Sequence, residues 1–383
     1  MTRIDQVNRD RIEWCCADYG LSAQDLAAEV GISEQSMQAI MGGDQQPTFL
    51  QLERIAKFFG RGVLFFLEPG APTTEEVHTP EFRTLANQKP NMAPRIRSLI
   101  ERAERQREVY VSLKEEIGEA DYPLFAPPDL QGMDLSAAAA AARRWLGLDD
   151  ENTFEGYREK VESAGVLVFR SNGYNGKWQI PKDNPILGFS LFDARCPLIV
   201  VRKEQWEVRQ TFTLMHELGH ILLHQTSSID DDQDMHGSDG SEREANAFAG
   251  LILVPDKYLQ TISDEDRPEE VSQFDEWLHE HRRALGVSSE VILRRLLDSG
   301  RLDHADYAAY RTWWRSRPDT AQESSGNRQY RHREPKHIFG DRFVRLVFDA
   351  LGSERITLAR ASSYLDSLKI SDLRELERHY AGV

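Results

Sequence analysis

The sequence has 383 residues, enough for roughly two or three domains of ordinary size. A formal net charge of −16 argues against a protein whose whole surface binds nucleic acid. No apolar run approaches the roughly 18 residues that a membrane helix needs, and the chain does not start with the apolar core of a signal peptide. The 3 cysteines, two of them adjacent, form no disulfide framework. Together these features predict a cytoplasmic protein with no membrane contact.

Residues 1–67 predict a compact helical unit. Ser22, Ser33 and Thr48 each precede a helical pattern that they are expected to cap, and Gly31 separates the first two patterns. A helix, a glycine and a second helix in this order are typical of a repressor-type helix-turn-helix, whose second helix enters the major groove of DNA. Over residues 9–67 the sequence resembles the Xre/Cro-type repressor family.

Two roles for this unit remain open. The second helix offers polar side chains that could read DNA bases, namely Ser33, Gln35, Ser36 and Gln38. However, residues 1–67 hold six basic and nine acidic side chains, a net charge of −3, and DNA affinity depends largely on neutralising phosphates. The unit therefore either binds DNA through residues 22–42, or serves to dimerise the chain or dock another protein.

A linker and further helices are expected over residues 68–150. Five prolines between residues 68 and 94 predict a linker without long regular structure. A helix should then run over residues 94–118. After a second proline-rich patch at residues 123–128, an alanine-rich helix is expected near residues 136–146.

The pattern becomes mixed from about residue 152. Short β-type runs at residues 166–169, 186–192 and 198–201 predict a small sheet, and helices follow to the end. The expected fold class is therefore α+β, mostly α, with a mixed domain over residues 151–300 and a helical C-terminal region over residues 301–383.

A basic segment interrupts the C-terminal region. Residues 311–345 hold nine basic and four acidic side chains, a net charge of +5. Because residues 318–336 are also polar and rich in Ser, Gln and Arg, a flexible, solvated connection is expected there.

The stretch His216-Glu217-Leu218-Gly219-His220 lies in a strongly helical sequence. Helical spacing puts His216 and His220 on one face, about one turn apart, where two imidazoles can share one Zn²⁺. Glu217 lies beside them and could take a proton from a water molecule. The alternative is a buried helix whose histidines are merely packed.

A catalytic zinc site needs a third protein ligand and keeps one position open. His224 is an unsuitable third ligand, because it lies about 12 Å along the helix axis from His216. A carboxylate from the helix predicted over residues 241–255 fits better. Glu242 shares the inward face of that helix and is favoured over Glu244, which lies toward the side.

Three more features of the site are expected. Asn246, on the same face as Glu242, should accept a hydrogen bond from a histidine N–H. Tyr258 is a candidate for stabilising an oxyanion, with His224 and His236 as competitors. Gly219, in mid-helix, suggests either close approach of another backbone or a small packing site.

The surroundings of the site also yield expectations. Residues 230–234, rich in aspartate, should form an exposed loop. Residues 188–192, which begin with Gly188, Phe189 and Ser190, are expected to form a strand at the edge of the sheet. There a substrate peptide could add by backbone hydrogen bonds.

Three blocks, GFSLFDARCPLIVV, RQTFTLMHELGHILLH and EREANAFAGLILVP, together resemble the ImmA/IrrE family of metallopeptidases over roughly residues 150–260. The resemblance implies a gluzincin-like core with one zinc ion. Its ligands match His216, His220 and Glu242, and its catalytic glutamate matches Glu217. Some members also carry an N-terminal helix-turn-helix and act in gene regulation, by cleaving a repressor or by sensing a signal.

The expected function is a zinc-dependent endopeptidase that acts on a regulatory protein in gene regulation, stress response or phage response. Two other classes stay open: a DNA-binding regulator whose zinc domain is a sensor, and an antitoxin-type regulator that binds protein. Glu217 favours the peptidase, because a purely structural zinc site needs no general base. A homodimer is one expected state, although no residue pattern specifies it.

Overall fold

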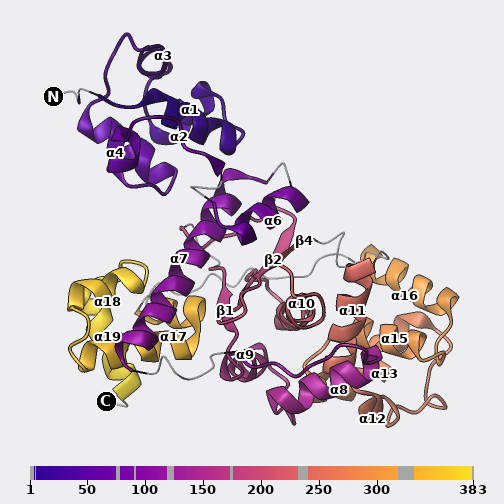
Figure 1. Ribbon diagram of the computed structural model, residues 1–383. Coiled ribbons are helices and arrows are strands. Elements are labelled where there is room, and N and C mark those ends of the chain that lie inside the picture. Colours follow the sequence, from indigo (N-terminus) through magenta and orange to yellow (C-terminus); the bar gives the residue numbers. More distant parts are fainter. Residues whose placement is uncertain are drawn as a thin grey trace. The chain divides into compact units, whose positions relative to one another are not determined.

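The computed structural model describes residues 4, 6–74, 78–89, 92–118, 125–172, 176–231, 240–317 and 332–381. The chain separates into two compact units, Met1–Arg102 and Ala103–Val383. Helices dominate both units, and the sheet has four strands (Figure 1). The predicted fold class, α+β and mostly helical, is therefore confirmed.

Helices joined by loops make up the first unit, and its described residues include no strand. As predicted, Ser22, Ser33 and Thr48 accept hydrogen bonds from backbone N–H groups at the starts of three helices. Gly31 has a φ of 64° and ends the first of these three helices in the left-handed conformation that glycine adopts without strain. The helices of this unit are α1 (Arg9–Asp18), α2 (Ala23–Val30), α3 (Glu34–Gly42), α4 (Phe49–Phe58), η1 (Val63–Leu67), α6 (Pro80–Gln88) and the start of α7 (Pro94–Glu116).

The expected linker over residues 68–94 contains the helix α6. It begins at Pro80, and Thr79 accepts a hydrogen bond from the backbone N–H of Phe82 at 3.1 Å. Proline is tolerated in the first turn of a helix, because the N–H that it lacks would have no helical partner there. The prediction excluded only long regular structure, so this helix of 9 residues adds to it and does not contradict it.

The sheet of the second unit consists of β1 (Leu167–Arg170), β2 (Ile186–Leu191), β3 (Leu198–Val201) and β4 (Ser228–Asp231) in the order β1-β3-β2-β4. Strand β1 is parallel to β3, and β2 is antiparallel to both β3 and β4. The three predicted strands are confirmed. The prediction that Gly188, Phe189 and Ser190 lie at an edge was wrong, because β4 pairs with β2 and makes it an interior strand.

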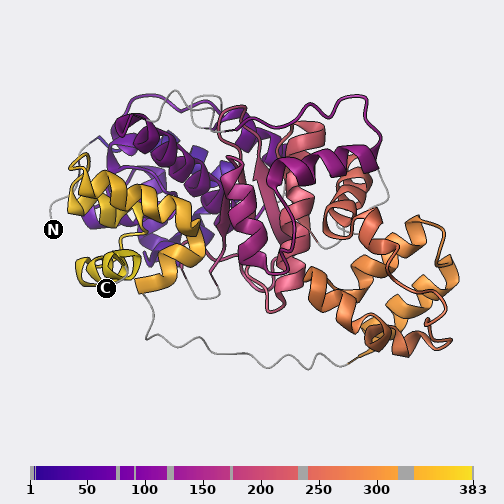
Figure 2. The same cartoon turned by 90° about the horizontal axis from the view of Figure 1, so that it is seen from below.

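Two long helices build the core beside this sheet. Helix α10 (Glu207–Gly219) packs against β2 and β3, and α11 (Gly240–Leu253) packs against α10 (Figures 1 and 2). Helix α8 (Leu135–Leu146) covers α11, and α9 (Phe154–Ser163) contacts β1. A π-helical turn, η2 (His220–His224), continues α10 directly. Such turns are rare in proteins, but those that occur are often found at functional sites.

The remaining helices complete the second unit. Arg158 of α9 donates hydrogen bonds to the carbonyl oxygens of Val168 in β1 and of His337 and Ile338 in α17, and so joins three elements. Most of the predicted flexible segment, residues 318–331, lies outside the described residues. The other helices are α12 (Asp256–Leu259), η4 (Val271–Gln273), α13 (Phe274–Trp277), α14 (His279–Leu285), α15 (Ser289–Asp298), α16 (His304–Ser316), α17 (Glu334–Gly352), α18 (Leu358–Tyr364) and α19 (Ile370–Ala381).

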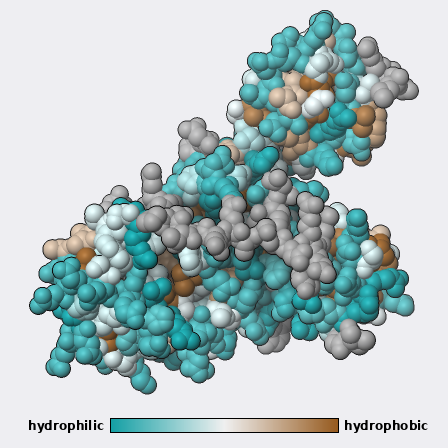
Figure 3. Space-filling model, turned by 180° about the vertical axis from the view of Figure 1, so that it is seen from behind, coloured by the Kyte–Doolittle hydropathy of each residue, from teal (hydrophilic) through white to brown (hydrophobic). Residues whose placement is uncertain are grey.

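The surface seen in Figure 3 is mostly hydrophilic, with hydrophobic patches in between. Large exposed hydrophobic side chains of the first unit are Phe49, Leu50 and Leu64, of which Leu64 is 74% exposed. No helix among the described residues combines the length and the apolar character needed to cross a membrane.

Candidate metal centre

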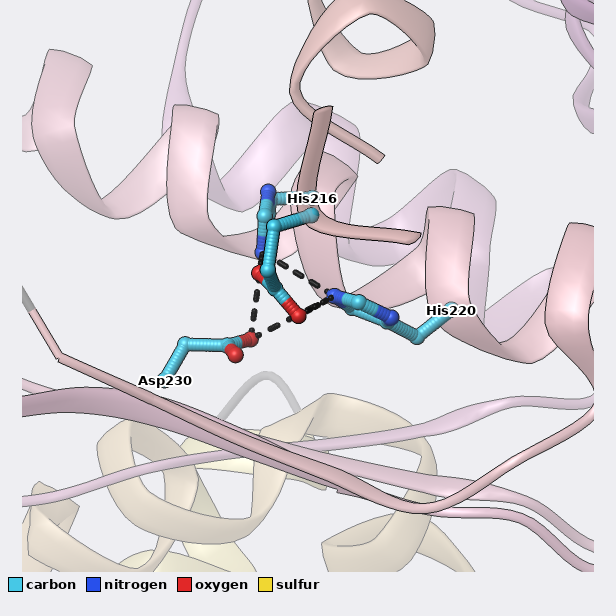
Figure 4. A group of neighbouring side chains, drawn as sticks. His216, His220 and Asp230 are labelled. Atoms are coloured by element: carbon cyan, nitrogen blue, oxygen red, sulfur yellow. Dashed lines mark hydrogen bonds and ion pairs between the residues drawn. The ribbon is translucent and has the colours of Figure 1, made fainter. Parts of the chain in front are cut away.

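Helix α10 and the turn η2 present two buried histidines on one face. His216 is 0% exposed and His220 is 2% exposed. Their Nε2 atoms lie 3.1 Å apart and face the same point (Figure 4). The predicted spacing of one helical turn therefore brings the two imidazoles together.

Glu242 comes from the first turn of α11 and faces both histidines. Its carboxylate oxygens lie 3.3 Å from His216 Nε2 and 3.5 Å from His220 Nε2. Glu244, the weaker sequence candidate, lies elsewhere, because its carboxylate contacts His224 at 3.1 Å and its side chain is 63% exposed.

Gly219 explains how α11 comes this close to α10. A Cβ atom at this position would lie 3.2 Å from Ala245 Cα and 3.3 Å from a ring carbon of Phe248. Of the two interpretations of this mid-helix glycine, close approach of another backbone is the one observed.

Asp230, on β4, is a fourth member of the group. Its Oδ2 atom lies 3.1 Å from His216 Nε2 and 3.6 Å from His220 Nε2. Ser228 donates a hydrogen bond to its other oxygen, Oδ1, at 3.0 Å. The expectation of an exposed loop was wrong for Asp230, which is 1% exposed; residues 232–234 lie outside the described residues.

The four side chains fit a metal ion. One nitrogen or oxygen atom from each of His216, His220, Asp230 and Glu242 lies within 4.8 Å of all the others. Five of the separations between these groups run from 3.1 to 3.6 Å. Ligand atoms about 2.0–2.2 Å from a tetrahedral zinc ion are about 3.3–3.6 Å apart, so the spacing suits such an ion.

The charges of the group also favour a cation. Among the described residues, no Lys or Arg lies within ion-pair distance of Asp230 or Glu242, although buried carboxylates need a positive partner. Two protonated imidazoles cannot supply this charge without repulsion, because their N–H groups would face each other across 3.1 Å. A cation bound between the side chains removes this conflict.

The pKa values of His216 and Glu242 are shifted in the directions expected for oppositely charged neighbours. Burial lowers the pKa of His216, but Asp230 and Glu242 outweigh burial and raise it to about 9. Burial raises the pKa of Glu242, but His216 and His220 outweigh burial and hold it below its ordinary value. His216 and the two carboxylates, Asp230 and Glu242, thus favour one another's charged forms.

A relay of hydrogen bonds orients His220. Its Nδ1 atom lies 3.2 Å from His224 Nδ1, and His224 Nε2 lies 3.1 Å from Glu244. One set of tautomers satisfies both bonds: His220 donates from Nδ1 to His224, and His224 donates from Nε2 to Glu244. This leaves His220 Nε2 free of hydrogen and available to a metal, the usual arrangement of a ligand histidine.

The expected bond between Asn246 and a histidine is not formed. The Oδ1 atom of Asn246 and the Nδ1 atom of His216 are both buried, and neither has a hydrogen-bond partner among the described residues. The support predicted from Asn246 comes instead from His224, through its contact with His220.

Glu217 is fully buried beside this group and packs against β2. Neither of its carboxylate oxygens has a hydrogen-bond partner among the described residues. A Cβ atom at Gly188 would lie 3.0 Å from Glu217 Oε1 and 2.7 Å from Thr213 Cγ2, so only glycine allows α10 to pack this closely. Burial, and then the Asp230 carboxylate, raise the pKa of Glu217 well above its usual range, while the Ser190 hydroxyl acts in the opposite direction.

Tyr258 is not brought to the group. It follows the C-terminal end of α11, whereas Glu242 lies in the first turn of this helix of 14 residues, which is about 20 Å long. The hydroxyl of Tyr258 lies 3.3 Å from His281 Nδ1. The competitor His236 lies outside the described residues.

Two of the four proposed DNA-reading side chains are engaged within the first unit. Ser33 caps α3 through the backbone N–H of Ser36, and the Ser36 hydroxyl accepts hydrogen bonds from Gln45 and Gln51. Gln35 and Gln38 are exposed on α3.

Part of the second unit matches a known protein family. Residues 162–297 match the family model of peptidase family M78, described as an IrrE N-terminal-like domain. No curated protein and no solved structure matches the chain. The matched range includes Glu217 and the candidate metal-binding group, which consists of His216, His220, Asp230 and Glu242. The match supports the resemblance to the ImmA/IrrE family and indicates a metallopeptidase-type function for this domain.

Proposed function

We propose that the protein is a zinc-dependent endopeptidase that cleaves a regulatory protein. The observation that carries the proposal is the convergence of His216, His220 and Glu242 beside the buried carboxylate of Glu217. Two imidazoles with carboxylates suit zinc better than magnesium or calcium, which prefer oxygen ligands alone.

In the proposed peptide hydrolysis, the zinc ion and Glu217 would have separate roles. A zinc ion held by His216, His220 and Glu242 would polarise the substrate carbonyl and make a water molecule more acidic. Glu217 then accepts the proton of the attacking water and passes it to the leaving amine. Burial raises the pKa of the Glu217 carboxyl, and a divalent cation nearby would counteract this shift and keep the group ionised.

The first test is Glu217→Gln. The substitution keeps the shape of the side chain but removes the base, so zinc content should stay unchanged while hydrolysis falls by at least about 100-fold. Zinc content and cleavage of a mixed-sequence peptide library measure the two effects. Glu207→Gln, at the exposed start of the same helix, is the matched control and should retain both. Unchanged cleavage by the Glu217→Gln protein would falsify the proposed mechanism.

The regulatory substrate can be sought with the same variant. A protein that binds the site without being cut should be captured by the Glu217→Gln chain and then cleaved when wild-type protein is added. Capture without later cleavage by the wild type would instead support an antitoxin-type role, in which the chain binds a protein and cuts nothing.

A second candidate function is a DNA-binding regulator whose metal domain is a sensor. It is favoured by the pair of helices α2 and α3 around the left-handed Gly31 and by the exposed Gln35 and Gln38. The proposed helix-turn-helix would then bind DNA in response to the metal site, which would report on ion supply.

A further inference from the structure

Strand β4 joins the metal-binding group to the edge of the sheet. It pairs antiparallel with β2, with Phe189 opposite Ile229 and Ser190 opposite Ser228. The register shifts between Ile186 and Gly188, next to Asp230. Irregularities of this kind re-aim a side chain and are common beside active sites. In Figure 4, Asp230 reaches the group from the strands, opposite the helix that carries the histidines.

We propose that Asp230 is a fourth protein ligand of the metal ion, and that β4 occupies the place of a substrate strand beside β2. The structure then describes a self-blocked state of the peptidase. This inference rests on the proposed function, because it assigns the block to the same site.

The contacts of Asp230 are those of a ligand rather than of a hydrogen-bond acceptor alone. His216 Nε2 has three neighbours at 3.1–3.3 Å: His220 Nε2, Asp230 Oδ2 and a Glu242 oxygen. A single N–H can point to only one of them, whereas a shared ion satisfies all four atoms. Ser228 holds Asp230 Oδ1 and leaves Oδ2 directed at the histidines, as groups around a metal site commonly orient its ligands.

Four protein ligands change what the site can do. A catalytic zinc ion keeps one of its tetrahedral positions open, whereas four protein ligands are typical of a structural site. If Asp230 fills that position, water and substrate can enter only after its carboxylate leaves.

The pairing of β4 suggests how the carboxylate leaves. An extended peptide commonly binds by adding a strand to the edge of a sheet, and β4 covers one edge of β2, the strand against which Glu217 packs. The strand is short, at 4 residues, and Ile229 is its one apolar side chain. A peptide that replaced β4 beside β2 would therefore displace Asp230 from the ion in the same movement.

Cobalt substitution in the full chain tests the ligand. Co²⁺ reports its coordination through its visible spectrum, and azide binds it where a protein ligand does not block the position. We expect no spectral change with azide in the wild type and a clear change in Asp230→Ala and in Asp230→Asn, which preserves side-chain volume. Zinc affinity, measured by competition with a chelator, should fall by roughly tenfold or more in both variants.

Asp231→Asn is the matched control. Asp231 is the next acid along β4, and alternation along a strand directs it to the opposite face, so its variant should behave as the wild type. If azide changes the wild-type spectrum as much as that of Asp230→Ala, Asp230 is not a ligand and the inference is overturned.

Cleavage rates of the peptide library by the wild type and by Asp230→Ala distinguish a failure of the self-blocking from a failure of the proposed peptidase function. Faster cleavage by Asp230→Ala than by the wild type supports self-blocking. Equal cleavage by both overturns self-blocking and leaves the peptidase function intact. If azide reaches only the variants but none of the proteins cleaves a peptide, Asp230 stands as a ligand, and the proposed function and the self-blocking are overturned.

Discussion

Gly219 sets the distance between the helix that carries the histidines and the helix that carries Glu242. A Cβ atom there would lie 3.2 Å from the backbone of Ala245, and a helix backbone cannot move aside as a long side chain can. Gly219→Ala should push α10 and α11 apart by a few tenths of an ångström and lower zinc affinity by roughly tenfold.

A matched glycine provides the control. A Cβ atom at Gly250, on α11, would lie 3.1 Å from a side-chain carbon of Arg295, which belongs to α15 and not to α10. Chelator competition should therefore find unchanged zinc affinity in Gly250→Ala. If both variants lose affinity equally, the spacing of α10 and α11 does not set the metal site.

Glu242 and Glu244 offer a second comparison between nearby residues. Glu242→Ala removes a carboxylate that faces both histidines and should lower zinc affinity by at least about 100-fold. Glu244→Ala removes only the acceptor for His224 and should cost no more than about tenfold. Equilibrium dialysis with zinc measures both. Equal losses would contradict the assignment of Glu242 as the ligand.

The sequence predicted the candidate site well where one periodicity connects its residues. His216, Glu217 and His220 lie on one helix, and Glu242 was found because it shares the inward face of the next predicted helix. Asp230 was missed, because the strand SIDD has one apolar residue and resembles a polar loop. Ser228 and Asp230 face the candidate metal-binding group rather than an apolar core, so no hydrophobic alternation marks the strand.

At the scale of elements, the polar sequence of β4 also explains why β2 was wrongly predicted to lie at the edge of the sheet. The apolar runs that form β1, β2 and β3 are buried, and the sequence located each of them to within a residue or two. It could not reveal that β4 pairs with β2, since backbone pairing over a distance leaves no trace in a polar sequence. Helix α6 was missed for another reason: Pro80 is compatible with both a linker and a first helical turn.

The kink in α17 is an element-scale feature that depends on one residue. Gly340 has a φ of 82° inside this helix, and a Cβ atom there would overlap the carboxylate of Glu162. The kink lies just after His337 and Ile338, whose carbonyls accept hydrogen bonds from Arg158. Gly340→Ala should therefore lower the free energy of unfolding by about 2–4 kcal/mol.

Urea denaturation measures this effect, and the control lies in the same helix. A Cβ atom at Gly352, the last residue of α17, would meet nothing within 4 Å. Gly352→Ala should change the unfolding free energy by no more than about 1 kcal/mol. A Gly340→Ala protein as stable as the wild type would show that the kink can relax without cost.

At the scale of the whole molecule, the role of the first unit decides between the two candidate functions. Arg11 pairs with Glu68 at 2.7 Å, and Arg61 pairs with Glu101 at 2.6 Å. The charges of Arg11 and Arg61 are thus already neutralised within the unit. Since phosphate contacts supply most DNA affinity, we expect a gel shift with the DNA upstream of the protein's own gene to be absent at about 150 mM salt.

A salt series and one variant complete this prediction. Any complex formed at low salt should disappear as salt rises, with little dependence on DNA sequence, because only charge would hold it. Gln38→Ala removes an exposed side chain of α3 that could read a base edge, at a cost of about 1–3 kcal/mol if it does so. A complex that survives at about 150 mM salt and is abolished by Gln38→Ala would establish sequence-specific binding. In that case the metal domain would act as a sensor, and the proposed helix-turn-helix would bind DNA in response to it.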